Sequence, residues 1–167
     1  MTRPRLATIW LDGCSGCHMS LLDMDERLIA LASRIHVVWG PYVDTKEFPP
    51  DVDVTLVEGS VSSEEDLHKI RVARERSKII VSLGDCAVTG NVPAMRNQFG
   101  ARAVLDKAYS VTPNQIIPAL LPTARPVHEL IKVDVFVPGC PPHADLIHTV
   151  ISDLLDGRQP DLKVKFG

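Results

Sequence analysis

The chain has few aromatic residues, no long apolar run and no excess of positive charge, and each absence excludes a class of function. Aromatic side chains make up 5% of its 167 residues, too few for a base-stacking nucleic-acid surface. The net charge is −3, so neither nucleic acid nor an anionic membrane is indicated as a partner. No segment reaches the roughly 18 uninterrupted apolar residues of a membrane-spanning helix, so no membrane span is expected.

Common catalytic and targeting signatures are also missing. The chain contains no Ser–His–Asp signature, no phosphate-binding loop and no G-x-G-x-x-G. Residues 1–13 include basic side chains but neither a signal-peptide apolar core nor a twin-arginine pair. We therefore expect a cytoplasmic protein. In a reducing cytosol, its few cysteines are expected to be metal ligands or catalytic groups rather than disulfides.

The composition is that of one globular domain. Apolar residues make up 45% of the chain and charged residues 23%, and no repeat or linker interrupts this composition. The length suits a single domain over residues 1–167, with a core large enough to fold without a metal.

Five short apolar runs rich in Val, Ile and Leu predict buried strands. Such strands, separated by helices, are typical of a parallel sheet covered on both faces. We expect an α/β fold, namely a flavodoxin-like, doubly wound sheet with strand order 2-1-3-4-5 and helices on both faces. The predicted strands are residues 6–11, 35–39, 53–58, 79–83 and 133–137.

Helices are indicated by apolar side chains at intervals of three or four residues. This spacing predicts one helix over residues 18–33 and a last helix that follows Pro142 and ends before Gly157. Ser62 and Glu65 match a capping box at the start of another helix. The apolar positions are Leu21, Met24, Leu28 and Leu31 in the first helix, Leu67, Ile70 and Ala73 in the second, and Ile147, Val150, Ile151 and Leu154 in the last.

Residues 91–131 carry five prolines, which exclude a long helix. We expect a short helix near 93–98 followed by a long, partly irregular crossover, and long excursions of this kind often serve an interface. The segment 98–131 is a candidate subunit contact, or alternatively a satellite core under a loop. Its apolar residues are Phe99, Ile116, Ile117, Leu120 and Leu121.

The four cysteines of the chain follow three of the predicted strands. Cys14 and Cys17 form a C-x-x-C after the first strand, Cys86 follows the fourth, and Cys140 follows the fifth. Because ligands collect at the carboxyl ends of parallel strands, the four thiols are expected to form one site. A 4Fe–4S cluster uses four thiolates in this way. A zinc site and four unrelated buried thiols are the alternatives.

Residues beside the cysteines fit an iron–sulfur site. Glycines flank the cysteines and allow close backbone approach, and Cys17 is expected to begin a helix, whose positive end suits an anionic cluster. Glu58 is either a polar site residue or a loop carboxylate, and Asp85 either orients a backbone amide or contacts a partner. The other neighbours are His18 and His143, expected in loops or interfaces, and Trp10 and Trp39, expected as core or interface anchors.

Four motifs in this order resemble the small subunit of nickel–iron hydrogenases. They are LDGCSGCHMSLLD, VEGS, SLGDCAVTGN and PGCPPHAD, and the resemblance spans residues 6–157. The short chain is most similar to the small subunit of cytoplasmic NAD-reducing, or bidirectional, hydrogenases. It resembles more distantly the cluster-bearing 20 kDa-type subunit of respiratory complex I, whose first ligands are adjacent cysteines.

This resemblance implies an electron-transfer subunit of a hydrogen:NAD+ oxidoreductase. Cys14, Cys17, Cys86 and Cys140 would bind one proximal 4Fe–4S cluster. The nickel–iron centre would lie in a large partner subunit, and FMN and further iron–sulfur clusters in a diaphorase module of the same hetero-oligomer. Many relatives have a glutamate, implicated in proton exit, two residues after the second cysteine, where this chain has Met19.

Other functions stay open at this point. The relay could serve a complex-I-like assembly, or one linked to ferredoxin or quinone. The chain could instead be a zinc-stabilised interaction module. A flavodoxin-like fold could also bind FMN at its strand ends, although the cysteines compete for that space.

Overall fold

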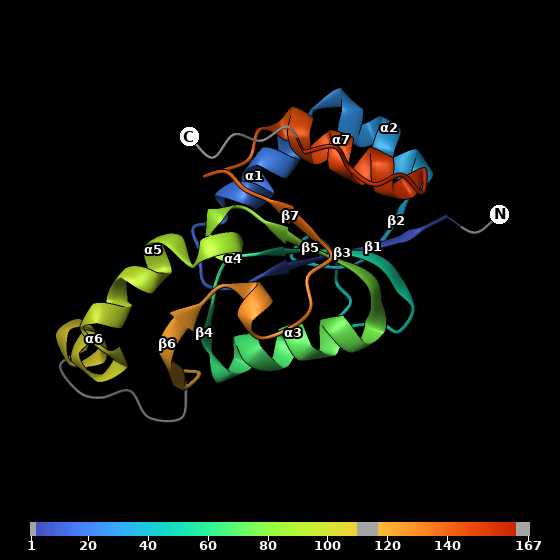
Figure 1. Ribbon diagram of the computed structural model, residues 1–167. Helices are drawn as coiled ribbons and strands as arrows, with labels where there is room; N and C mark the ends of the chain where they lie inside the picture. Colours follow the sequence, from blue (N-terminus) through green and yellow to red (C-terminus); the bar gives the residue numbers. More distant parts are fainter. Residues whose placement is uncertain (1–2, 110–116, 163–167) are drawn as a thin grey trace.

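Five parallel strands form the centre of the protein, in the order β2-β1-β3-β5-β7 (Figure 1). The computed structural model describes residues 3–109 and 117–162. The order is the predicted 2-1-3-4-5 when the parallel strands are numbered along the chain. Their bounds are β1 (Arg5–Trp10), β2 (His36–Trp39), β3 (Val52–Glu58), β5 (Ser77–Leu83) and β7 (Val135–Val137).

Helices cover both faces of the sheet and bury two apolar layers (Figure 1). One face packs against α1 (Gly16–Leu22), α2 (Glu26–Arg34) and α7 (Ala144–Leu155). The other packs chiefly against α3 (Glu64–Arg76). Because both faces are covered, the strands are apolar along most of their length, which is the pattern the sequence shows. The last helix is confirmed, and it ends before Gly157.

The predicted helix over residues 18–33 is two helices. Its apolar face was predicted correctly, since Leu21, Met24 and Leu31 are buried. Residues 23–25 separate α1 from α2, and at Asp25 the backbone turns to a φ of 52°. A positive φ at a residue other than glycine is incompatible with a continuous helix, so the apolar spacing continues across the break while the hydrogen bonding does not.

The capping box of α3 lies one residue later than predicted. The Ser63 hydroxyl accepts a hydrogen bond from the Asp66 N–H at 3.1 Å, and the Asp66 carboxylate accepts one from the Ser63 N–H at 2.9 Å. Ser62 instead lies within the short strand β4 (Val61–Ser63), which the sequence analysis did not predict. Since this strand holds residues 61–63 extended, the helix begins after Ser63.

The crossover over residues 91–131 has more regular structure than predicted. Its elements are α5 (Asn91–Ala94), η1 (Met95–Gln98), α6 (Ala101–Ala108), β6 (Leu120–Arg125) and η2 (Val127–Glu129), and a further short helix, α4 (Asp85–Thr89), precedes it. Strand β6 pairs antiparallel with β4. Leu121 is buried in the core, Phe99 is 66% exposed, and Ile116 lies outside the described residues. Within the described ranges, no helix is both long and apolar enough to cross a bilayer.

Candidate metal centre

The four cysteines lie at the carboxyl edge of the parallel sheet. Cys14 and Cys17 lie between β1 and the first turn of α1, Cys86 lies in α4 directly after β5, and Cys140 follows β7. Cys17 is buried, Cys86 is partly exposed, and Cys14 and Cys140 are exposed. All four are free thiols. The convergence of three separate loops, which the sequence predicts, is therefore present in the fold.

The electrostatics of the thiols show that they share one neighbourhood. Burial raises the pKa of the Cys17 thiol, the negative charge of Glu58 raises it further, and the other three thiols add to the same effect. Burial also raises the pKa of Cys86, followed by the charges of Cys140 and Cys14. Like charges raise a thiol pKa in this way only at short range, so the sulfur atoms lie within electrostatic reach of one another.

Hydrogen bonds between backbones lock the loops that carry Cys86 and Cys140. The N–H of Gly84 donates to the carbonyl of Val137 at 2.7 Å, and the N–H of Asp85 donates to the carbonyl of Gly139 at 2.9 Å. In return, the Asp85 carboxylate accepts from the Gly139 N–H at 2.7 Å. Asp85 thus orients a backbone amide, one of the two roles predicted for it.

Gly84 is the point of closest approach between two cysteine loops. Its φ is 82°, and a Cβ placed on it would overlap the sulfur of Cys17. Only glycine combines this backbone conformation with the absence of a side chain. Helix α1 is also joined to the Cys140 loop, since the Ser20 hydroxyl donates to the Pro142 carbonyl at 2.5 Å.

Asn91 is a site residue that the sequence analysis missed. Its side-chain amide donates to the sulfur of Cys140 at 3.6 Å, and it also interacts with Cys86, as does the backbone N–H of Val92. Donors to sulfur stabilise the thiolate form and adjust the potential of sulfur-ligated metals. Asn91 is the last residue of the SLGDCAVTGN motif, and this position is the sequence signal that could have identified it.

Glu58 and His18 form a buried pair beneath the C-x-x-C turn. Glu58 is the last residue of β3 and is 2% exposed, so it is a polar site residue and not a loop carboxylate. Its carboxylate accepts from the His18 N–H at 2.9 Å and also contacts the Nδ1 atom of that ring. His18 is 4% exposed, so its predicted loop or interface position is wrong. His143 is exposed and caps α7.

The four thiols provide the donor set of a 4Fe–4S cluster, which takes one thiolate at each of four irons. A single tetrahedral zinc ion with bonds of about 2.3 Å would need its sulfurs within roughly 4 Å of one another. Within residues 3–109 and 117–162, no three His, Cys, Asp or Glu side chains form such a single-ion group.

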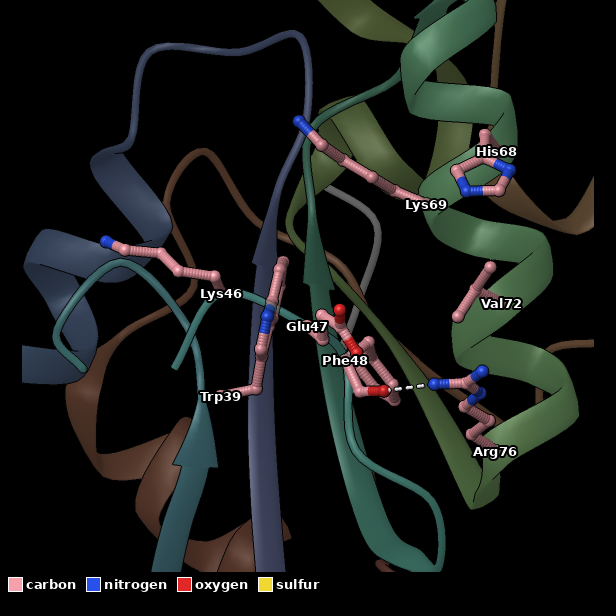
Figure 2. A pocket seen from close by; sticks show the side chains of 8 residues that line it. All are labelled: Trp39, Lys46, Glu47, Phe48, His68, Lys69, Val72 and Arg76. Atoms are coloured by element: carbon pink, nitrogen blue, oxygen red, sulfur yellow. Dashed lines mark hydrogen bonds between the residues drawn. The ribbon is translucent and has the colours of Figure 1, made fainter. Parts of the chain in front are cut away.

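A hollow on the α3 side of the sheet is separate from the cysteines (Figure 2). The connection from β2 to β3 has no helix, and Phe48 from this loop packs against Trp39 with ring centroids 5.3 Å apart. Arg76 of α3 reaches across and donates to the Phe48 carbonyl. The remaining hollow of about 400 Å³ is also lined by Lys46, Glu47, His68, Lys69 and Val72.

Comparisons with known proteins identify the family of the chain. The family model described as NADH ubiquinone oxidoreductase, 20 Kd subunit, matches residues 14–154. The chain is 42% identical over 170 residues to the delta subunit of the NAD-reducing hydrogenase HoxS of Cupriavidus necator, an alignment that spans 95% of this chain and 81% of that subunit. It is 30% identical over 159 residues to the delta subunit of sulfhydrogenase 2 of Pyrococcus furiosus, over 95% of this chain but only 65% of that subunit.

A solved structure extends the comparison to three dimensions. One chain of an NAD+-reducing NiFe hydrogenase in the H2-reduced state superimposes with a TM-score of 0.95 at 36% identity. The superposition covers 99% of this chain and all of that one. The fold is therefore shared along nearly the whole chain.

Proposed function

Because the chain belongs to the family of NADH ubiquinone oxidoreductase 20 Kd subunits, and within it to the hydrogenase small subunits, we propose that it relays electrons in an NAD-reducing nickel–iron hydrogenase. The observation that carries the proposal is the convergence of Cys14, Cys17, Cys86 and Cys140 at one edge of the sheet. These four thiols would hold one 4Fe–4S cluster, which supplies one-electron transfer when bound.

The residues of the chain position the ligands and do no bond chemistry of their own. Gly84 gives Cys17 room, Asp85 and its backbone partners join two loops, and Asn91 donates to sulfur. A rigid ligand frame limits rearrangement when the charge of the bound group changes, which suits electron transfer. We further propose that residues 1–167 act as a single cluster-bearing domain.

The partners would be a large subunit with the nickel–iron centre and a diaphorase module with FMN and further iron–sulfur clusters. Exposed apolar side chains near the cysteine edge support such contacts, since patches of this kind mark interaction sites on soluble proteins. Trp10 ends β1, Met19 follows Cys17, and Val92 and Met95 follow Asn91, and all four are exposed. The cytoplasm is the proposed compartment, because free thiols suit a reducing environment.

Anaerobic reconstitution of the full chain tests the proposal. Iron and acid-labile sulfide analysis, combined with EPR of the reduced protein, is expected to give about one 4Fe–4S cluster per chain. A Cys86→Ser, Cys140→Ser double variant should lose the cluster. Ala32→Ser, which adds the same side chain at an exposed position of α2, should keep it. A cluster retained by the double variant contradicts the proposal.

A second candidate keeps the relay but changes the assembly. The description of the matching family, which mentions NADH and ubiquinone, favours a complex-I-like or quinone-linked enzyme. Purification of the native complex separates the two, because nickel in stoichiometric amount identifies a hydrogenase and its absence favours the alternative. Zinc without iron or sulfide would instead select an interaction module.

A further inference from the structure

Two buried ionisable side chains, Glu58 and His18, lie beside the cysteines and are not among the four proposed ligands. Burying a carboxylate is costly unless hydrogen bonds compensate it. Among the described residues, the Glu58 carboxylate is met by the backbone N–H and the Nδ1 atom of His18. Since His18 directly follows Cys17, these contacts fix the end of the C-x-x-C turn onto the last residue of β3.

The two ring nitrogens of His18 have different surroundings. Its Nδ1 contacts the Glu58 carboxylate, whereas its Nε2 is buried and has no hydrogen-bond partner among the described residues. The ring therefore meets Glu58 through Nδ1 alone.

Tyr42 also holds the His18 ring in place. The Tyr42 ring stands edge-on to His18 with centroids 5.7 Å apart, and its hydroxyl donates to the His18 carbonyl at 3.3 Å. Burial and the charge of Glu58, in that order, raise the pKa of Tyr42, so this phenol stays neutral and adds no second charge. The carboxylate is thus the fixed charge beneath the Cys17 turn.

We propose that Glu58 is a positioning residue that fixes the Cys17 turn through His18 and keeps the reduction potential of the bound cluster low. This inference rests on the proposed function, because it assigns a role toward the 4Fe–4S cluster. Reduction adds one electron, and a buried negative charge at close range disfavours that gain. Burial makes the effect larger than it would be at the surface, because water screens the charge less.

Glu58→Gln tests the inference in the reconstituted full chain. Glutamine has nearly the same shape and retains a carbonyl oxygen for the His18 N–H, but it carries no charge. An EPR-monitored redox titration is expected to show a midpoint potential above that of the wild type with the cluster content unchanged. Asp53→Asn is the matched control, because Asp53 lies on the same strand at the opposite end of the sheet. Its potential should equal the wild-type value.

The remaining outcomes also decide the matter. An unchanged midpoint potential in Glu58→Gln overturns the inference, and so does a folded Glu58→Gln chain that takes up no cluster, since a tuning charge is not required for ligation. If Glu58→Gln does not fold, Glu58→Asp replaces it, with a smaller upward shift expected because the retained charge is withdrawn from the turn. A wild-type potential in that variant overturns the inference too. Failure of the wild type itself to take up a cluster overturns the proposed function instead.

Discussion

The carboxylate of Asp85 accepts a hydrogen bond from the backbone N–H of Gly139 at 2.7 Å and so joins the segment after β5 to the segment after β7. Asp85→Ala should lower the free energy of unfolding of the metal-free chain by about 1–3 kcal/mol, because a hydrogen bond to a charged acceptor is lost. Urea unfolding followed by circular dichroism measures this. Asp85→Asn keeps an acceptor for the Gly139 N–H and should lower the free energy of unfolding clearly less. Equal losses of stability in the two variants would contradict the role of Asp85 in joining the two segments.

Gly84→Ala should impair cluster uptake. The added Cβ would overlap the sulfur of Cys17, and the φ of 82° is strained for alanine by about 1–3 kcal/mol. Gly157→Ala is the control, because that glycine also has a positive φ, of 70°, but nothing lies within 4 Å of its Cβ position. Iron content after reconstitution should fall in the first variant only. Similar iron content in both would show that the close approach is unimportant.

The Arg74–Asp134 ion pair should make stability depend on pH in acid. Burial opposes ionisation of Asp134, but hydrogen bonds from the Ile80 N–H and from Arg74 outweigh it and lower its pKa. The pKa of Asp134 in the folded chain lies below its value of about 3.9 in the unfolded chain. The ionised carboxylate therefore contributes fully to the free energy of unfolding above about pH 3.9, and this contribution is lost as the pH falls through the folded pKa.

Asp134→Asn should therefore destabilise the chain by about 1–2 kcal/mol at pH 7, and the difference from wild type should shrink below pH 4. Urea titrations across this pH range measure it. The exposed pair Arg102–Asp106 provides the control, since Asp106→Asn should change stability by less than about 0.5 kcal/mol at any pH. If the difference in free energy of unfolding between Asp134→Asn and the wild type stays constant with pH, ionisation of Asp134 does not contribute to stability.

Ile70→Ala should destabilise the fold by about 2–5 kcal/mol, because this α3 side chain is fully buried against the sheet and its removal leaves a cavity. Ile29→Ala makes the same chemical change on α2, where the side chain is 75% exposed, and should cost under about 1 kcal/mol. Unfolding midpoints in urea compare the two. Comparable losses would mean that the packing of α3 is not as described.

The sequence was sufficient to predict the parallel sheet and the convergence of the cysteines, because apolar runs and strand-end ligands are both local signals. The sequence did not predict strands β4 and β6. Their pairing joins segments about 60 residues apart, and neither strand shows an alternation of apolar and polar residues. The break at Asp25 was missed for a related reason. Apolar spacing reports which face is buried, not whether the backbone hydrogen bonds continue.

Within the site, the sequence indicated a ligand set and the candidate neighbours Glu58 and Asp85, but not the contact between Glu58 and His18. Glu58 and His18 lie 40 positions apart, so only the strand register could bring the carboxylate under the turn. Asn91 was missed because an amide after a helix usually serves as a turn residue. The ligand assignment itself stays a prediction until a cluster is measured.

The unequal exposure of the four thiols gives the site an inner and an outer side. Cys17 is buried, while Cys14 and Cys140 are exposed. Iron and sulfide supplied from solution would therefore meet Cys14 and Cys140 first, and Cys17 would be the last thiol to be reached.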